Sequence, residues 1–296
     1  MEPTTIKLFI DNNWMDAENR NTLEIINPST LKQAGVIALG SKTDVKKALF
    51  SAEKAFPMWA KTSGEQRAVL IKKAADAVLD CQGEIAQILT AEHGKPLSDA
   101  LGEIKGAANY LYYYAEEARR IGGEIAPSKS TTSKSLVIKQ PRGVVAAIAP
   151  WNYPIALMAW KIAPALAAGC TVVAKPSLAT PLACTLFCSI IAEAGLPPGV
   201  LNVISGLSSE IGDELVVNPI SRTIAFTGST STGASIAAKA APGFKKLILE
   251  LGGQTPMVVF KDAQIDKAVT DGVKRSFRNM GQICNAVNRI FVEKEI

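Results

Sequence analysis

The stretch GVVAAIAPWNYPIALMAWKIAPALAAGCTVVAKP, residues 143–176, carries the strongest indication of the fold. It begins with a short apolar run, turns between Pro150 and Pro154, continues as an apolar helical pattern to Gly169 and ends in a second apolar run. Because neither run alternates with polar residues, both predict strands that are buried on two faces and joined by a helix. The stretch therefore predicts a βαβ unit, from which doubly wound sheets are built.

The alternation of strand and helix patterns continues to residue 252. After the first unit come PLACTLFCSIIAEAG, LNVISG, SSEIGDELVVN, TIAFTG, STGASIAAKAA and KKLILELGG, interpreted in turn as helix, strand, helix, strand, helix and strand. This order predicts the α/β class, with a doubly wound parallel sheet that forms a Rossmann-like cofactor-binding domain over residues 143–252. Turn residues divide the apolar stretch 144–174 into pieces too short to cross a bilayer, so we expect no membrane partner.

Three further segments flank this domain. Residues 1–126 contain short strand-like runs followed by long helical patterns, and we assign them to the N-terminal part of the cofactor-binding domain; the tyrosines at 110–114 are interpreted as helix–helix packing. Residues 127–142 join a Ser/Thr/Lys-rich loop to the alternating run KSLVIKQ, which predicts bridging strands able to pair with another subunit. Residues 253–296 are expected to hold one strand, one helix and a cysteine turn.

The composition is that of an ordinary globular protein. Of 296 residues, 48% are hydrophobic, and 32 basic against 27 acidic residues give a net charge of +5. No block of Lys and Arg indicates a nucleic-acid surface, and the N-terminus has no secretion signal. Five cysteines without a Cys-x-x-Cys pair suit free thiols in the cytoplasm and predict no metal site. The single histidine, His93, is interpreted as structural, which disfavours mechanisms that need an imidazole base.

Ligands of doubly wound sheets bind beyond the carboxyl ends of the strands, so the residues that follow each strand are candidates. In FTGSTSTG, Gly228, Ser229 and Gly233 suit a phosphate group at a helix N-terminus, although a plain turn with an N-cap is the alternative. Lys175 could bond a ribose hydroxyl or a phosphate, or extend from the strand end into solvent. Asn152 offers a short amide donor, or an Asx turn.

Glu250 and Cys284 are the candidates for chemistry. Glu250 ends the apolar run LILEL and precedes two glycines, and a carboxylate is costly to bury unless it is paired or used. Cys284 follows in FRNMGQIC, after a predicted amphipathic helix, where Gly281 lets another backbone approach closely. A cysteine nucleophile in a chain with one histidine would use a carboxylate or water as its base.

Together these residues resemble the aldehyde dehydrogenase superfamily. The similar sequence runs from about Ile25 to Val292, and PWNYP, KPS, FTGSTSTG, ELGG and FRNMGQIC match the family's motifs in order. The resemblance implies an enzyme that uses NAD or NADP to oxidise a small aldehyde to the carboxylic acid, through a thiohemiacetal and a thioester on a cysteine.

The resemblance also implies a role for individual residues. Cys284 matches the nucleophile, Glu250 the general base, and Asn152 the oxyanion donor that acts beside the Cys284 backbone N–H. Lys161 matches a lysine near the active site that assists proton movement. The cofactor-binding positions are matched by Trp151, Lys175, Ser177, Gly228, Ser229, Gly233 and Leu251.

The chain departs from the family at positions that bear on cofactor and substrate. The glutamate usual after Lys-Pro-Ser is Leu178, which removes an acceptor for the adenosine 2′-hydroxyl and makes NADP plausible beside NAD. Among the branches the chain most resembles the succinate-semialdehyde dehydrogenases, and Arg278 matches an arginine that meets the substrate carboxylate there. A second such arginine falls at Trp160, which cannot take that role. We therefore expect a semialdehyde substrate, such as succinate semialdehyde.

In the family the chain continues beyond the nucleophile. We therefore expect residues 253–296 to be the start of an incomplete catalytic domain, and the full-length form to be a homo-oligomer. The 296 residues by themselves are expected to show little or no turnover and weak cofactor binding. Two alternatives stay open: an inactive cofactor-binding fragment, and a cysteine-dependent esterase or acyl transferase.

Overall fold

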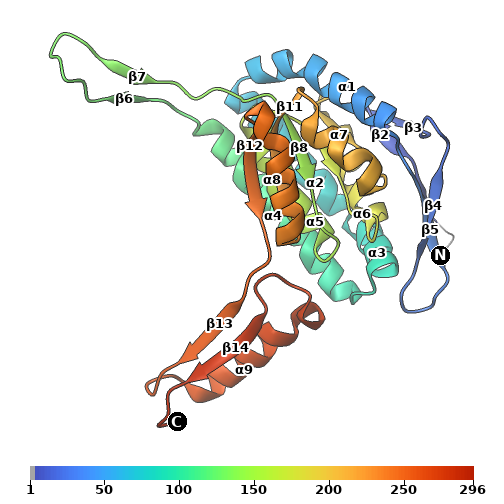
Figure 1. Ribbon diagram of the computed structural model, residues 1–296, viewed down its shortest axis with the longest axis vertical. Coiled ribbons are helices and arrows are strands. Elements are labelled where there is room, and N and C mark those ends of the chain that lie inside the picture. Colours follow the sequence, from blue (N-terminus) through green and yellow to red (C-terminus); the bar gives the residue numbers. More distant parts are fainter. Residues whose placement is uncertain (1–3) are drawn as a thin grey trace.

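The computed structural model describes residues 4–296 (Figure 1). In this range the main sheet has seven strands, in the order β12 (Lys246–Glu250), β11 (Ser221–Thr227), β8 (Val144–Ile148), β9 (Thr171–Lys175), β10 (Leu201–Val203), β2 (Leu8–Ile10) and β3 (Asn13–Met15). The strands from β12 to β10 are parallel, whereas β2 lies antiparallel to β10 and β3 antiparallel to β2. The predicted α/β class and the mainly parallel sheet are thus confirmed.

Helices cover both faces of this sheet, because its central strands are apolar on both sides (Figure 1). One face carries α1 (Lys42–Lys61), α7 (Asp213–Val217) and α8 (Thr230–Ala240). The other carries α5 (Pro154–Ala167) and α6 (Pro181–Glu193), with α2 (Gly64–Asp80), α3 (Gln82–His93) and α4 (Leu97–Arg119) packed outside them. Val144 and Ala146 belong to the first core and Val145 and Ala147 to the second, as the two-residue period of a strand requires.

Two expectations about helices are refined by the structure. The segment SSEIGDELVVN is not one helix, because a π-helical turn, η1 (Ser208–Gly212), precedes α7. The packing interpretation of the tyrosines holds for Tyr110, which stacks on Trp160 of α5 although it is 38% exposed, and is wrong for Tyr113, which is 58% exposed. None of the helices within residues 4–296 combines the length and apolarity needed to cross a membrane.

Two small sheets extend from the N-terminal half. In the first, β4 (Thr22–Ile26) pairs antiparallel with β5 (Gln33–Ala38), which also pairs in parallel with β1 (Thr4–Ile6). β6 (Glu124–Ala126) and β7 (Ser135–Val137) form an arm that projects from the body (Figure 1) and exposes apolar side chains. The arm thus begins before residue 127, within the segment assigned to the N-terminal part. The division into domains and the role of the arm in oligomerisation stay predictions.

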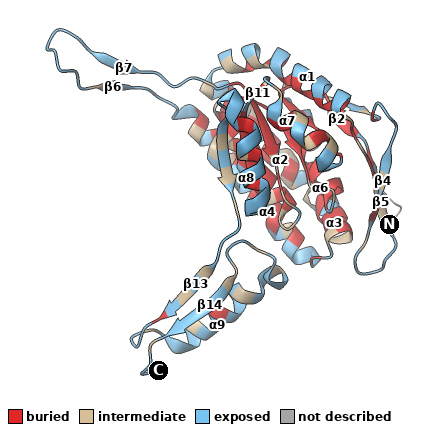
Figure 2. Ribbon diagram, viewed as in Figure 1, coloured by how far each residue is buried: buried red, intermediate tan, exposed pale blue. Residues whose placement is uncertain are grey.

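The last segment forms a separate lobe below the main body (Figure 1). It contains β13 (Thr255–Val259), α9 (Ile265–Phe277), the short helix η3 (Arg278–Gly281) and β14 (Val287–Val292). The expectation of one strand is wrong, because β14 pairs in parallel with β13. Most of this lobe is exposed (Figure 2), and within residues 255–296 only Val259 and Gly272 are buried. The lobe therefore has almost no core of its own.

Candidate active site

The turn between β8 and α5 places Asn152 at the carboxyl end of a central strand. Asn152 Nδ2 donates to the Gln282 carbonyl oxygen at 2.8 Å, and Asn279 Nδ2 donates to the Asn152 carbonyl oxygen at 3.3 Å. These bonds join the turn to the segment that precedes Cys284, whose side chain is exposed. The structure therefore brings the predicted amide donor and the predicted nucleophile into neighbouring segments.

The Asn152 carboxamide keeps capacity for a further hydrogen bond. A carboxamide nitrogen carries two N–H groups, of which Gln282 accepts one. Oδ1 of Asn152 is buried and accepts no hydrogen bond from any residue between 4 and 296. Asn152 can therefore act as donor and acceptor beside the Cys284 segment.

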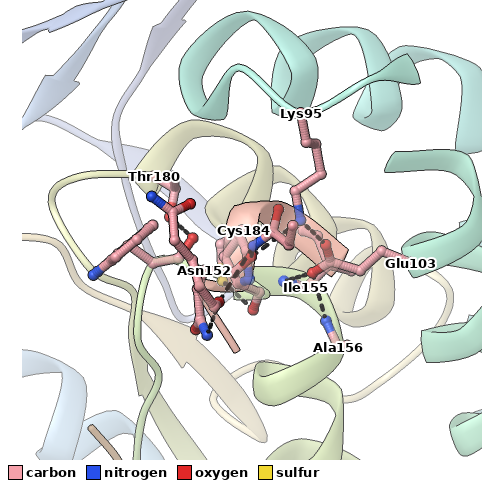
Figure 3. A network of polar contacts seen from close by, with 11 residues as sticks. Lys95, Glu103, Asn152, Ile155, Ala156, Thr180 and Cys184 are labelled. Atoms are coloured by element: carbon pink, nitrogen blue, oxygen red, sulfur yellow. Dashed lines mark hydrogen bonds and ion pairs between the residues drawn. The ribbon is translucent and has the colours of Figure 1, made fainter. Parts of the chain in front are cut away.

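A buried ion pair behind this turn was missed by the sequence analysis (Figure 3). Lys95 Nζ lies 2.5 Å from Glu103 Oε2 and donates to the Asn152 carbonyl oxygen at 3.1 Å. The Lys95 and Glu103 side chains are 2% and 1% exposed. The sequence feature that could have indicated this pair is the position of Glu103, which shares a face of α4 with the buried residues Ala100 and Ala107.

Lys161 and Glu250 line one cavity of about 220 Å³ together with Tyr110 and Trp160. Lys161 Nζ donates to Thr227 Oγ1 at 2.6 Å. Burial lowers the pKa of Lys161 to about 8, against the opposite effect of the Glu250 carboxylate. Cys284 does not line this cavity, so the structure groups the predicted base with Lys161 rather than with the thiol.

Glu250 is exposed, contrary to the expectation of a buried carboxylate. The reason is its place on β12, which is the edge strand of the main sheet and has side chains that alternate between half-buried and exposed. Tyr110 and Trp160, which also line the cavity, stack on each other with ring centroids 5.3 Å apart and an interplanar angle of 30°. The apolar run LILEL therefore indicated a strand correctly but not its burial.

The N-terminus of α8 follows β11. Ser229 is its N-cap, and Ser229 Oγ accepts from the Thr232 N–H at 3.2 Å. The Gly228 N–H donates to the Glu250 carbonyl oxygen at 3.1 Å. A Cβ at Gly233 would lie 2.5 Å from Leu251 Cδ2. The space beside Gly233, which we expected a phosphate group to approach, is therefore occupied by the Leu251 side chain.

The end of β9 places Lys175 in the protein interior. It is 4% exposed, so the alternative of an extension into solvent is wrong. Its Nζ donates to Ser208 Oγ at 3.1 Å, and burial lowers the pKa of Lys175 to about 8. Ser177 Oγ accepts from the Ala179 N–H at 3.3 Å, while Leu178 is half-buried against the core.

The remaining predicted residues lie at the surface around this site. The Trp151 side chain is 41% exposed, and its ring centroid is 5.9 Å from that of His93. Burial, with a smaller contribution from Lys95, lowers the pKa of His93 to about 4. Arg278 is exposed, with its guanidinium carbon 5.7 Å from the centre of the Tyr153 ring.

Residues 4–296 contain no group of three or more His, Cys, Asp or Glu side chains placed to hold a metal ion.

Comparison with known proteins gives consistent matches. A profile described as "Aldehyde dehydrogenase family" matches residues 14–296. The chain is 42% identical to the mitochondrial succinate-semialdehyde dehydrogenase of Arabidopsis thaliana, over 97% of this chain and 54% of the relative. It is 39% identical to the NADP(+) succinate-semialdehyde dehydrogenase of Escherichia coli, over 96% of this chain and 59% of the relative. A crystal structure of Staphylococcus aureus betaine aldehyde dehydrogenase with NAD+ has a TM-score of 0.94 and 35% identity, over 98% and 59% of the two chains. The chain thus spans between about half and three-fifths of the length of these relatives.

Proposed function

This chain belongs to the aldehyde dehydrogenase family, and from that premise we propose that its residues serve the NAD(P)-dependent oxidation of an aldehyde to a carboxylic acid. The observation that carries the proposal is the hydrogen bond of 2.8 Å from Asn152 Nδ2 to the Gln282 carbonyl oxygen. It brings an amide donor at the end of a central strand to the segment of an exposed cysteine, Cys284.

In the proposed first step, the Cys284 thiolate attacks the carbonyl carbon of the aldehyde, and a C=O electron pair moves onto the oxygen. The second N–H of Asn152 Nδ2 and the Cys284 backbone N–H donate to this oxyanion. Donors held in place before the reaction stabilise the developing charge, and one such donor contributes about 10²–10³ in rate. The product of this step is a thiohemiacetal on Cys284.

A bound NAD+ or NADP+ would supply the hydride acceptor that conversion of the thiohemiacetal on Cys284 to a thioester requires. Glu250 then takes a proton from a water molecule that attacks the thioester, and the acid and the Cys284 thiolate are released. The exposed position of Glu250 leaves its carboxylate accessible to water. Lys161 lines the same cavity, and its pKa of about 8 suits the transfer of a proton near neutral pH.

The strand ends fit a dinucleotide. The N–H groups and dipole at the start of α8, capped by Ser229, suit the pyrophosphate. Lys175 Nζ carries three N–H groups and donates one to Ser208, so it can also bond a ribose hydroxyl. Leu178 presents no carboxylate to a 2′-phosphate, which favours the use of NADP as well as NAD. The other proposed cofactor contacts are Trp151, Ser177, Gly228, Gly233 and Leu251.

For the substrate we propose a semialdehyde such as succinate semialdehyde. The exposed Arg278 lies close before Cys284 in the chain and can pair with a carboxylate at the far end of such a molecule. Trp160 stacks on Tyr110 and supplies no second cation. The proposed specificity for the carboxylate therefore rests on Arg278.

The arm formed by β6 and β7 supports a proposed homo-oligomer. Its side chains Ile125, Leu136 and Ile138 are 67%, 67% and 75% exposed, and a second subunit could cover them. A cytoplasmic location stays a prediction from the cysteine content.

The test compares two reactions of the same purified protein. One assay follows NAD(P)H formation from succinate semialdehyde, and the other follows hydrolysis of p-nitrophenyl acetate without nucleotide. Aldehyde-dependent NAD(P)H formation that disappears in Cys284→Ser supports the proposal, and for the 296 residues by themselves we expect its rate to be low. Ester hydrolysis without any NAD(P)H would instead identify a cysteine-dependent esterase or acyl transferase.

One observation favours a second candidate, a cofactor-binding unit without turnover. The lobe of residues 255–296 exposes large apolar side chains such as Phe260, Phe277 and Met280, so the segment around Cys284 has little packing to hold it. Nucleotide binding by calorimetry, with neither NAD(P)H formation nor ester hydrolysis, would identify this case.

A further inference from the structure

The ion pair between Lys95 and Glu103 lies in the interior of the protein. Both side chains are almost fully withdrawn from solvent, and Lys95 Nζ lies 2.5 Å from Glu103 Oε2. A buried ion pair must offset the desolvation of two charges, so it contributes little net stability compared with apolar residues of the same volume. The role of the pair is therefore expected to lie in the backbone groups that Lys95 and Glu103 bind, rather than in stability.

Lys95 holds the peptide unit that follows Asn152. Its Nζ donates to the Asn152 carbonyl oxygen at 3.1 Å (Figure 3). The same Nζ lies 4.3 Å from the centre of the Tyr153 ring. Together with Glu103, these groups surround the ammonium with a carboxylate, a carbonyl oxygen and the negative face of an aromatic ring. The orientation of the Asn152 backbone is thus fixed from the turn between α3 and α4.

Glu103 holds the other side of the same turn. Its Oε1 accepts from the Ile155 N–H at 2.9 Å and from the Ala156 N–H at 3.1 Å, in the first turn of α5 (Figure 3). Within the described residues, the N-cap of α5, Tyr153, makes no capping hydrogen bond with its own side chain. A carboxylate from α4 therefore caps α5 across the core.

We propose that Lys95 and Glu103 are positioning residues for the Asn152 amide. The ion pair fixes the backbone immediately after Asn152 at two points, so that one N–H of Nδ2 stays bonded to the Gln282 carbonyl and the other faces the oxygen of a carbonyl bound at Cys284. This role rests on the proposed function, because it assumes that Asn152 serves as the oxyanion donor. Neither residue touches the reacting atoms.

The test separates two reactions of the Cys284 thiolate. p-Nitrophenyl acetate transfers its acetyl group to sulfur and expels p-nitrophenolate through a tetrahedral oxyanion, which Asn152 would stabilise. Iodoacetamide alkylates the same sulfur by displacement of iodide, with no oxyanion. The ratio of the two rates at Cys284, followed by mass spectrometry, therefore reports on the oxyanion donor and cancels changes in exposure or thiolate content.

Lys95→Met removes the ammonium and is expected to lower the acylation-to-alkylation ratio at least about ten-fold, because a small misplacement of a catalytic group costs a large factor in rate. Lys95→Arg, which keeps the charge, should restore part of the ratio. Arg67→Met is the matched control. Arg67 is also a buried cation, and its Nε donates to the Ala167 carbonyl oxygen at 3.0 Å, away from the turn. This control should leave the ratio unchanged within about two-fold.

A second pair of variants keeps the test decisive if Lys95→Met does not fold. Glu103→Gln weakens the hold on α5, and Glu92→Gln is its control. Glu92 caps α6 in the same manner, because its carboxylate accepts from the Leu182 and Ala183 N–H groups at 2.8 and 2.9 Å. A fall of the ratio in Glu103→Gln but not in Glu92→Gln supports the proposal.

The outcomes also distinguish this proposal from the proposed function. Asn152→Ala should lower the ratio more than any of these variants. If it does, and the Lys95 and Glu103 variants leave the ratio unchanged, the positioning role is wrong and the oxyanion role stands. If Asn152→Ala itself leaves the ratio unchanged, the oxyanion role is wrong and the positioning proposal falls with it.

Discussion

Replacement of Lys161 by methionine is expected to stabilise the fold while it removes the proposed proton carrier. Lys161 is 8% exposed, and within residues 4–296 its Nζ bonds only to uncharged atoms, Thr227 Oγ1 at 2.6 Å and the Leu157 carbonyl oxygen at 3.1 Å. Methionine is of similar length and uncharged, so it can occupy the same space without the cost of burying a charge.

The size of the effect follows from the pKa of Lys161, which burial lowers from 10.5 to about 8. The unfolded chain therefore binds the proton more tightly than the folded protein, and this group makes stability rise with pH between about 8 and 10.5. The shift corresponds to about 3 kcal/mol of destabilisation by the charged lysine near neutral pH. The two lost hydrogen bonds, at about 1 kcal/mol each, offset about 2 kcal/mol of this. The net stabilisation of Lys161→Met is expected to be about 1 kcal/mol.

Urea unfolding of both proteins at about pH 7 and about pH 9.5 measures this difference. The gain in the free energy of unfolding should shrink toward zero at the higher pH, because the wild-type lysine is then largely neutral in the folded protein. Comparison of the two proteins cancels the titration of Lys175 and Lys245, the pKa values of which burial also lowers to about 8. A variant that is less stable at both pH values, or a gain independent of pH, would refute the reasoning.

A thiol reagent should modify Cys284 in the native protein before Cys81, Cys170, Cys184 and Cys188; equal modification of all five by peptide mass mapping would argue against an activated thiol. Leu178→Glu should weaken NADP binding relative to NAD by about ten-fold, because it places a carboxylate near the 2′-phosphate. Titration with the fluorescent reduced nucleotides NADH and NADPH measures this, and a parent protein that already rejects NADPH would show the argument to be wrong. Arg278→Gln should raise KM for succinate semialdehyde about ten-fold and leave KM for an uncharged aldehyde of similar length unchanged, because only the former loses an ion pair. Equal changes for both aldehydes would exclude a contact between Arg278 and the carboxylate.

The central sheet could be predicted because each of its strands can be recognised from its own residues. β8 and the centre of β9, residues 172–174, are apolar at every position, which few structures other than a parallel sheet covered on both faces can accommodate. The turn after β8 and the start of α8 likewise follow from short motifs. The family resemblance placed Asn152 and Cys284 near each other, and the structure joins their segments through Gln282.

The parts that the sequence did not predict depend on contacts between distant segments. The contacts of Lys95 and Glu103 form only when the turn after β8 packs against α4. No local sequence pattern shows which helix N-terminus lacks a cap of its own. The exposure of Glu250 depends on the position of β12 at the sheet edge, which is a property of strand order. β14 was overlooked because its residues are exposed and lack the alternation of a half-buried strand.

The central claim is that Cys284 attacks an aldehyde and is left, after hydride transfer, as a thioester. The most direct measurement is peptide mass mapping of the Glu250→Gln variant, in which hydrolysis of the thioester should be slow, after incubation with succinate semialdehyde and NAD+ or NADP+ and an acid quench. An acyl group can arise from an aldehyde only by oxidation, so its mass on a cysteine reports both attack and hydride transfer. The account predicts a succinyl group on Cys284 that requires nucleotide and is absent in Cys284→Ser. No acyl group on Cys284, or one that forms without nucleotide or on another cysteine, would contradict it.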